Sequence, residues 1–145
     1  MDRQNIVGIN SLQAFIEREL PVLVCYDLTT RADGRVVYFI RNYETDLIKI
    51  GTTRNLRYRV KQINKAEGTY CQLLIAIPGD RQVEKELHRA FADTAICEDP
   101  RNEWFYCSSE LYEFITDMRV YLYLANRPLF ETCLHIDNEV LRGSQ

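Results

Sequence analysis

The sequence has no long hydrophobic run, and its amino terminus lacks the pattern of a targeting segment. No apolar stretch approaches the roughly 20 residues that a membrane-spanning helix needs. The first ten residues, MDRQNIVGIN, do not show the basic and then apolar order of a signal peptide. These absences predict a protein that neither spans a membrane nor carries a secretory leader.

The sequence also lacks any paired-cysteine motif. Its five cysteines are an odd number, show no C-x-x-C spacing and are spread among apolar segments: Cys25, Cys71, Cys97, Cys107 and Cys133. This pattern argues against a zinc cluster and against a disulfide framework. We therefore expect buried free thiols in the reducing cytoplasm, and a cytoplasmic protein.

Basic residues are outnumbered by acidic ones overall but are locally concentrated. The net charge of −3 is not that of a generally basic nucleic-acid-binding protein. The segment from Lys49 to Lys65, however, has six basic residues and no acidic one, and a local patch of this kind can bind a phosphate backbone. Four of its residues lie away from the apolar stripe of a predicted helix and form a candidate nucleic-acid-binding face, with an ordinary solvated helix face as the alternative: Arg54, Arg57, Lys61 and Lys65.

Two short runs rich in β-branched and aromatic residues predict a β-hairpin. They cover residues 36–41 and 47–51, and the polar segment between them suits a hairpin loop. If Arg41 pairs with Asp46, Tyr38 lies directly opposite Lys49. The hairpin would then carry a phenol and an ammonium group side by side on one face of a sheet.

Apolar periodicity predicts the remaining elements. Helices are expected over residues 54–66, 81–91 and 110–125, and a central strand over residues 70–77. Before the hairpin, residues 10–20 read as a helix and 22–28 as a further strand; no structure is assigned beyond residue 130. The predicted fold is α/β, a small three-stranded, mainly antiparallel sheet flanked by helices. We expect one domain over residues 1–145, with an amino-terminal elaboration (1–35), a core (36–107) and a carboxyl-terminal helix and tail (108–145).

Several short motifs occur in a characteristic order. Val36-Val37-Tyr38 is followed by Lys49-Ile50-Gly51, and Arg59 comes eight residues after the glycine. Further on stand the pattern E-x-x-x-H, from Glu84 to His88, and the tripeptide E-W-F, which begins at Glu103. In their order and spacing these motifs resemble the GIY-YIG nuclease superfamily, in particular its phage-associated branch with K-I-G in place of Y-I-G and a later E-W-F segment.

The resemblance implies a metal-dependent endonuclease that hydrolyses phosphodiester bonds in DNA. Glu84 would be the metal ligand, for Mg²⁺ or Mn²⁺, and Arg59 would clamp a phosphate oxygen. Tyr38 would orient or deprotonate the attacking water, helped by Lys49, which would lower the pKa of the phenol or hold the phosphate. His88 is a further acid–base candidate. Glu103 and Trp104 are interpreted as structural, with Trp104 packed under the helix expected over residues 81–91.

Two residues depart from the superfamily pattern. Lys49 stands where a second tyrosine is usual, and Ile63 stands where many relatives have a histidine. A lysine cannot replace a phenol as a base linked to a metal, so these departures bear on the details of the mechanism more than on the fold.

Two other classes of function stay open at this stage. One is a catalytically weak or inactive module that binds nucleic acid or protein, although such a module has no need for the Glu84 carboxylate beside a phosphate. The other is self-association, because the predicted helix 110–125 carries Tyr112, Tyr121 and Tyr123 and could form a homodimer face. The choice between DNA and RNA cannot be read from these motifs.

Overall fold

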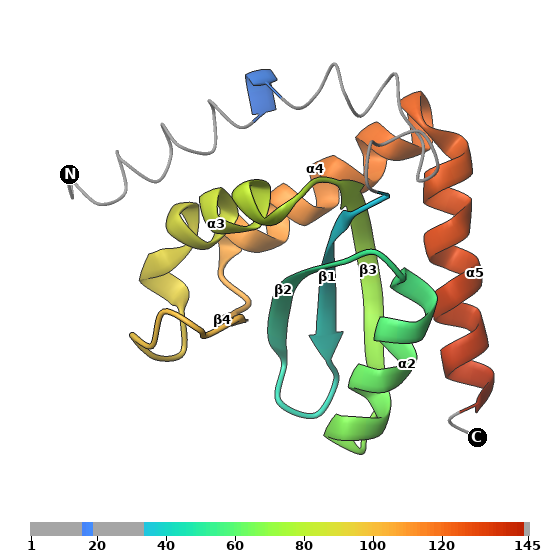
Figure 1. The fold of residues 1–145 in the computed structure, drawn as a ribbon, viewed down its shortest axis with the longest axis horizontal. Helices are drawn as coiled ribbons and strands as arrows, with labels where there is room; N and C mark the ends of the chain where they lie inside the picture. Colours follow the sequence, from blue (N-terminus) through green and yellow to red (C-terminus); the bar gives the residue numbers. More distant parts are fainter. Residues whose placement is uncertain (1–15, 19–33, 144–145) are drawn as a thin grey trace.

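The computed structural model describes residues 16–18 and 34–143, and it is built around a four-stranded antiparallel sheet (Figure 1). The strand order is β3-β1-β2-β4. In chain order the elements are β1 (Val36–Asn42), β2 (Leu47–Thr53), α2 (Leu56–Glu67), β3 (Cys71–Pro78), α3 (Arg81–Ala90), the 3-10 turn η1 (Ala92–Thr94), β4 (Trp104–Tyr106), α4 (Ser109–Ala125) and α5 (Arg127–Gly143).

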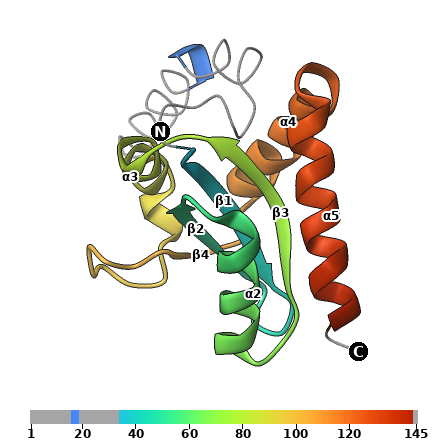
Figure 2. The same cartoon turned by 45° about the vertical axis from the view of Figure 1, so that its right-hand side comes forward.

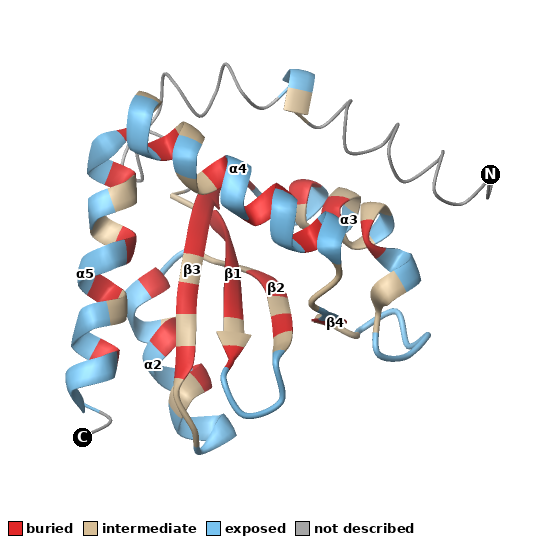
Figure 3. Cartoon of the chain, turned by 180° about the vertical axis from the view of Figure 1, so that it is seen from behind, coloured by how far each residue is buried: buried red, intermediate tan, exposed pale blue. Residues whose placement is uncertain are grey.

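Helices pack on both faces of the sheet. Helix α2 covers one face, α4 covers the other, and α5 runs along β3 at the edge (Figure 2). The stripe predicted for α2 is confirmed, since Leu56, Val60 and Ile63 are all buried. On the opposite face, the rings of Phe39 and Phe114 lie 5.8 Å apart and join β1 to α4. The buried residues accordingly follow the three long strands and the inner sides of the helices (Figure 3).

The α/β class is confirmed, but the predicted three-stranded sheet has a fourth strand. Residues 104–106 pair antiparallel with β2 through the partners Leu47 and Tyr106, Ile48 and Phe105, and Lys49 and Trp104. The predicted helix over residues 10–20 and strand over 22–28 lie largely outside the described residues. Residues 16–18 are helical, and Arg18 forms an ion pair with Glu86 of α3. None of the helices in the described part of the chain is long and apolar enough to cross a membrane.

The predicted register of the hairpin is wrong by two residues. Tyr38 lies opposite Gly51, and it is Ile40 that lies opposite Lys49. The loop comprises residues 43–46 because the side chain of Asn42 accepts hydrogen bonds from the backbone N–H groups of Glu44 and Thr45 and so ends β1 one residue later than expected. A shift by two residues leaves every side chain on its predicted face. Tyr38 and Lys49 therefore still share the face that α2 covers.

The prediction that residues 70–77 form a central strand is also wrong. Strand β3 lies at one edge of the sheet, and its apolar side chains are covered by helices, chiefly α5. Most of α5 lies beyond residue 130, where no structure is predicted from the sequence. Its first turn contains Pro128, which a helix tolerates there because the missing N–H would have no partner in the helix anyway. The acid Asp137 of α5 accepts hydrogen bonds from the Tyr70 hydroxyl at 2.8 Å and from the backbone N–H of Leu73 at 3.1 Å.

Gly51 is required by the close approach of Tyr38. A Cβ atom at position 51 would lie 2.3 Å from the phenol oxygen of Tyr38 and 2.5 Å from its Cζ atom. Both contacts are far inside van der Waals distance. Only a glycine in β2 therefore leaves room for the Tyr38 ring to lie across the neighbouring strand.

We predict that Gly51→Ala destabilises the fold by about 1–3 kcal/mol, because the added methyl group forces the buried Tyr38 ring to move. Urea unfolding measures the change in the free energy of unfolding. Gly143→Ala, where an added Cβ meets nothing within 4 Å, serves as the control and should be close to neutral. An unchanged urea midpoint for Gly51→Ala would show that the ring does not occupy this space.

Candidate functional site

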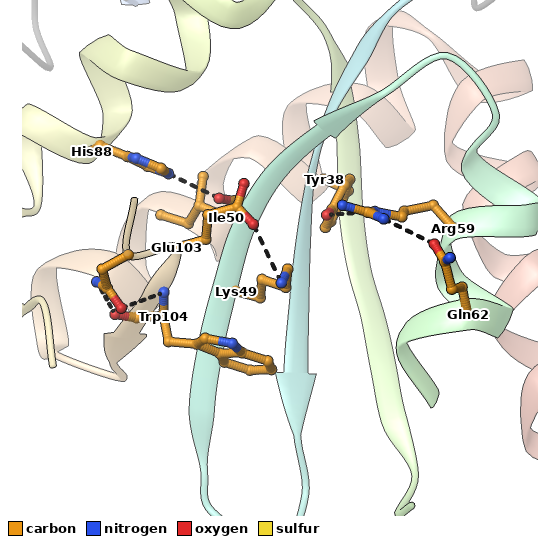
Figure 4. Close-up of polar contacts among 9 residues, drawn as sticks. Tyr38, Lys49, Ile50, Arg59, Gln62, His88, Glu103 and Trp104 are labelled. Carbon is orange, nitrogen blue, oxygen red and sulfur yellow. Dashed lines mark hydrogen bonds and ion pairs between the residues drawn. The ribbon is translucent and has the colours of Figure 1, made fainter. Parts of the chain in front are cut away.

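The first part of the site is a pair formed by Tyr38 and Arg59. Helix α2 starts after Asn55, whose side chain accepts a hydrogen bond from the Tyr58 N–H, and this start places Arg59 over the sheet. The Nε–H of Arg59 donates to the Tyr38 hydroxyl at 3.3 Å, and Nη1 donates to Oε1 of Gln62 at 2.8 Å (Figure 4). A guanidinium has five N–H groups, so three are left for a ligand once these two bonds to described residues are made.

The environment of Tyr38 does not suit a general base. Its side chain is fully buried, with 0% exposure. Burial is the main reason that the pKa of the phenol is raised; the Arg59 hydrogen bond lowers it, while the charges of Glu103 and Glu84 raise it further. The direction of this shift is opposite to the lowering expected from Lys49. Tyr38 accepts a hydrogen bond from Arg59 but has no exposed surface that a substrate could contact.

The second part of the site joins β2 to the segment that enters β4. Nζ of Lys49 lies 3.2 Å from Oε2 of Glu103 and 5.3 Å from the centre of the Trp104 ring (Figure 4). The backbone N–H of Ile50 donates to the Glu103 carbonyl at 2.8 Å, so Glu103 is tied directly to β2. The expectation that Trp104 packs under the helix over residues 81–91, which is α3, is wrong, because its ring lies beside the Lys49 ammonium group.

Glu84 supplies a second carboxyl group to the same region. It lies in the first turn of α3, whose N-cap Asp80 accepts hydrogen bonds from the N–H groups of Gln82 and Val83. The Oε2 atom of Glu84 is buried and has no hydrogen-bond partner among the described residues. Burial, followed by the charge of Glu103 and a hydrogen bond with it, raises the pKa of Glu84 to about 7, and Arg81 and Arg35 only partly offset this shift. Near pH 7 the carboxyl group of Glu84 is therefore only partly ionised.

His88 holds α3 against β2. Its Nε2 atom lies 2.8 Å from the backbone carbonyl oxygen of Ile50, an acceptor, so this nitrogen carries the proton (Figure 4). The ring also packs against Phe105 of β4, with centroids 5.1 Å apart. His88 thus fixes the helix that carries Glu84, one turn earlier, and its Nε2 proton is already committed to the backbone.

Four of the predicted site residues share an electrostatic environment with one residue that was not predicted. The four are Tyr38, Lys49, Arg59 and Glu84. Glu84 and Glu103 both raise the pKa values of Tyr38 and of Arg59, and Lys49 is bonded to Glu103. The unpredicted residue is Glu103, which the sequence analysis took to be structural. The signal that could have found it is Lys49 itself, because an ammonium group on a largely buried sheet face needs an acid close by.

The four basic residues predicted to bind nucleic acid lie apart from these groups, one in the bend before α2 and three on the outer side of that helix. All four are exposed: Arg54, Arg57, Lys61 and Lys65. Two of them already share a partner on α5, since Glu139 lies 2.9 Å from Nε of Arg57 and 3.7 Å from Nζ of Lys61. A phosphate group that binds Arg57 or Lys61 would have to displace the exposed carboxylate of Glu139.

The raised pKa of Glu84 gives a testable dependence of stability on pH. The folded protein keeps this proton up to about pH 7, whereas the unfolded chain loses it near the ordinary value of 4.5. The free energy of unfolding therefore falls as the pH rises between these two values. We predict that Glu84→Gln is more stable than the wild type by about 1–2 kcal/mol above pH 7, after allowance for solvent screening, and that the gain disappears near pH 4.5.

Urea unfolding at pH 5 and pH 8, without added metal, checks this prediction. The control is Glu113→Gln, an exposed position on α4, which should change stability equally little at both values. A gain for Glu84→Gln that is the same at pH 5 and pH 8 would contradict the assigned pKa.

Comparison with known proteins identifies the family. Residues 35–119 match the T5orf172 domain, more than half of the 145-residue chain. No curated protein and no solved structure matches the chain. The matched region contains the whole sheet together with Arg59, Glu84 and Glu103. The chain therefore belongs to the T5orf172 domain family, a phage-associated group of nuclease-related domains.

Proposed function

We propose that this protein is a metal-dependent endonuclease that hydrolyses phosphodiester bonds in DNA. The observation that carries the proposal is the position of Glu84, whose buried and unpartnered carboxyl oxygen lies in the same electrostatic environment as Arg59 and Lys49. An acid within electrostatic range of a guanidinium group, with an ammonium group bound to the neighbouring acid Glu103, is an arrangement suited to a phosphate held together with a cation. Membership of a nuclease-related family supports the same reaction class.

The residues present fit a divalent metal with few protein ligands. The described residues contain no group of three or more histidine, cysteine or acidic side chains that could enclose a metal. Mg²⁺ tolerates such a sparse site because it keeps several waters and binds substrate phosphate oxygens. Glu84 would hold the ion through the oxygen that lacks a partner. When bound, the metal supplies charge stabilisation at the phosphate and makes a coordinated water more acidic.

Arg59 would bind a non-bridging phosphate oxygen. Its planar fork suits phosphate, and its hydrogen bonds to Tyr38 and Gln62 fix the direction of the remaining N–H groups. Tyr38 is then a positioning residue, since it is buried and acts only through Arg59. Lys49 lies on the same face of the sheet and adds a second positive charge to which a phosphate can bind.

Glu84→Gln should reduce plasmid nicking in Mg²⁺ or Mn²⁺ by about 100-fold or more, because a metal contributes several kcal/mol to the stability of the transition state. The measurement is conversion of supercoiled to open-circular DNA over time. Glu113→Gln, on the opposite face of the sheet, is the matched control and should cut like the wild type. Nicking by Glu84→Gln at the wild-type rate would remove Glu84 from the mechanism.

Arg59→Lys should lower the rate of nicking by about 10- to 100-fold while the protein stays folded, because a lysine cannot reproduce the two-pronged contact with phosphate. The same assay, together with a far-UV circular dichroism spectrum, checks both parts of this statement. Arg142→Lys, an exposed position near the end of α5, provides the comparison. Equal rates for Arg59→Lys and the wild type would argue against a fork-like contact.

The burial of Tyr38 and the backbone bond of His88 favour one alternative, a non-catalytic module that binds nucleic acid. The plasmid assay separates the two functions, because a binding module retards DNA in a gel without nicking it at any metal concentration. The choice between DNA and RNA is decided by repeating the assay with a labelled RNA.

The homodimer suggested by the tyrosines of α4 stays a separate prediction. Tyr112 and Tyr123 are exposed, at 58% and 45%, and a measurement of mass in solution tests it.

A further inference from the structure

We propose that Glu103 is a second carboxylate ligand of the metal site and that Lys49 occupies the place of the cation until a metal binds. With a metal held by Glu84 and Glu103, Lys49 would be released from Glu103 and would contact the phosphate of the substrate. This inference rests on the proposed endonuclease function and assigns roles within the same site.

The position of Glu103 is fixed by its backbone. Its carbonyl accepts from the N–H of Ile50 at 2.8 Å, which ties residue 103 to the strand that carries Lys49. On its other side, Asn102 donates to the Trp104 carbonyl at 2.7 Å and accepts from the Trp104 N–H at 3.2 Å. Because both neighbours of Glu103 are held in this way, its carboxylate has a defined place beside β2.

The pair of Lys49 and Glu103 is more buried than an ordinary surface ion pair. The side chains are 17% and 29% exposed, respectively. Exposed pairs contribute little and form often by chance, whereas a largely buried pair requires a place built for both partners. The ammonium group therefore lies where the site is built to hold a positive charge.

One ammonium group does not balance two facing acids. The Ile50 backbone bonds to both sides of the site, since its N–H donates to the Glu103 carbonyl and its carbonyl oxygen accepts from His88, one turn after Glu84. Oε2 of Glu84 is buried and has no hydrogen-bond partner among the described residues. The pair of carboxyl groups thus has a free oxygen on one side and an oxygen bound by Lys49 on the other. A divalent cation between them would satisfy both acids and leave Lys49 without its partner.

Lys49 has a second contact that would keep it in the site. Its Nζ lies 5.3 Å from the centre of the Trp104 ring, within the range of a cation–π interaction. A lysine is a point charge on a flexible stem with rotatable donors, so its ammonium can turn away from Glu103 and still lie over the ring. The ring would therefore keep the freed ammonium group within the site.

The test uses the only tryptophan of the chain, Trp104, as a reporter. Tb³⁺ bound at the carboxyl pair is sensitised by this indole, and competition by Mn²⁺ gives the affinity of the metal alone, without any assay of cleavage. We expect Glu103→Gln to weaken Mn²⁺ binding at least about tenfold. Lys49→Met, which removes the competing ammonium, should bind Mn²⁺ several-fold more tightly and yet nick plasmid DNA at least about tenfold more slowly. Glu113→Gln is the control for both measurements.

The outcomes separate this inference from the proposed function. If Glu84→Gln abolishes Mn²⁺ binding while Glu103→Gln binds like the wild type, the endonuclease proposal stands and the role of Glu103 is wrong. If Lys49→Met binds Mn²⁺ no more tightly than the wild type, Lys49 does not hold the place of the cation. If the wild type neither binds Mn²⁺ nor nicks DNA, the proposed function itself fails. Because Lys49→Met and Glu103→Gln test different predictions, a folding defect in one variant leaves the other decisive.

Discussion

The contact between the carboxyl groups of Glu84 and Glu103 is the constraint around which the site is built. Burial, and after it the charge of Glu103, raise the pKa of Glu84, because two acids that face one another in partly buried surroundings repel when both are ionised. The fold maintains the contact from both sides. His88 holds α3 to the Ile50 carbonyl, and the Ile50 N–H holds Glu103. A single residue of β2 thus anchors both acids through its own backbone.

The basic half of the site depends on a different kind of contact. Tyr38 can lie across β2 only because residue 51 is a glycine, and its hydroxyl then reaches Arg59 of α2. Packing in the hairpin therefore sets the direction of a guanidinium group on a helix. The hydroxyl contributes through position rather than acidity, since burial of the ring raises its pKa. Acidic and basic groups thus come from separate elements that meet at β2.

The sequence predicted the local features of this protein better than its long-range pairings. The apolar stripe of α2, the hairpin and the faces of its strands all follow from periodicity, because spacing along the chain determines them. The register did not follow, since it depends on how the Asn42 side chain caps the loop. Strand β4 has three residues, too few for a periodic pattern, and its pairing with β2 is what gives Glu103 its place. Helix α5 lies mostly beyond residue 130, where no element is predicted, and Pro128, a residue type that usually follows the end of a helix, lies in its first turn.

Helix α5 lies entirely beyond the family match, which ends at residue 119, yet it protects the outer strand of the family's sheet. Its acid Asp137 accepts from the backbone N–H of Leu73 in β3, an edge strand. Such N–H groups, left bare, are templates for strands of other molecules. A protein trimmed to the family boundary would keep every residue of the candidate site but would expose this edge to aggregation. The segment that the family match covers is thus shorter than the segment needed to cover the edge of its sheet.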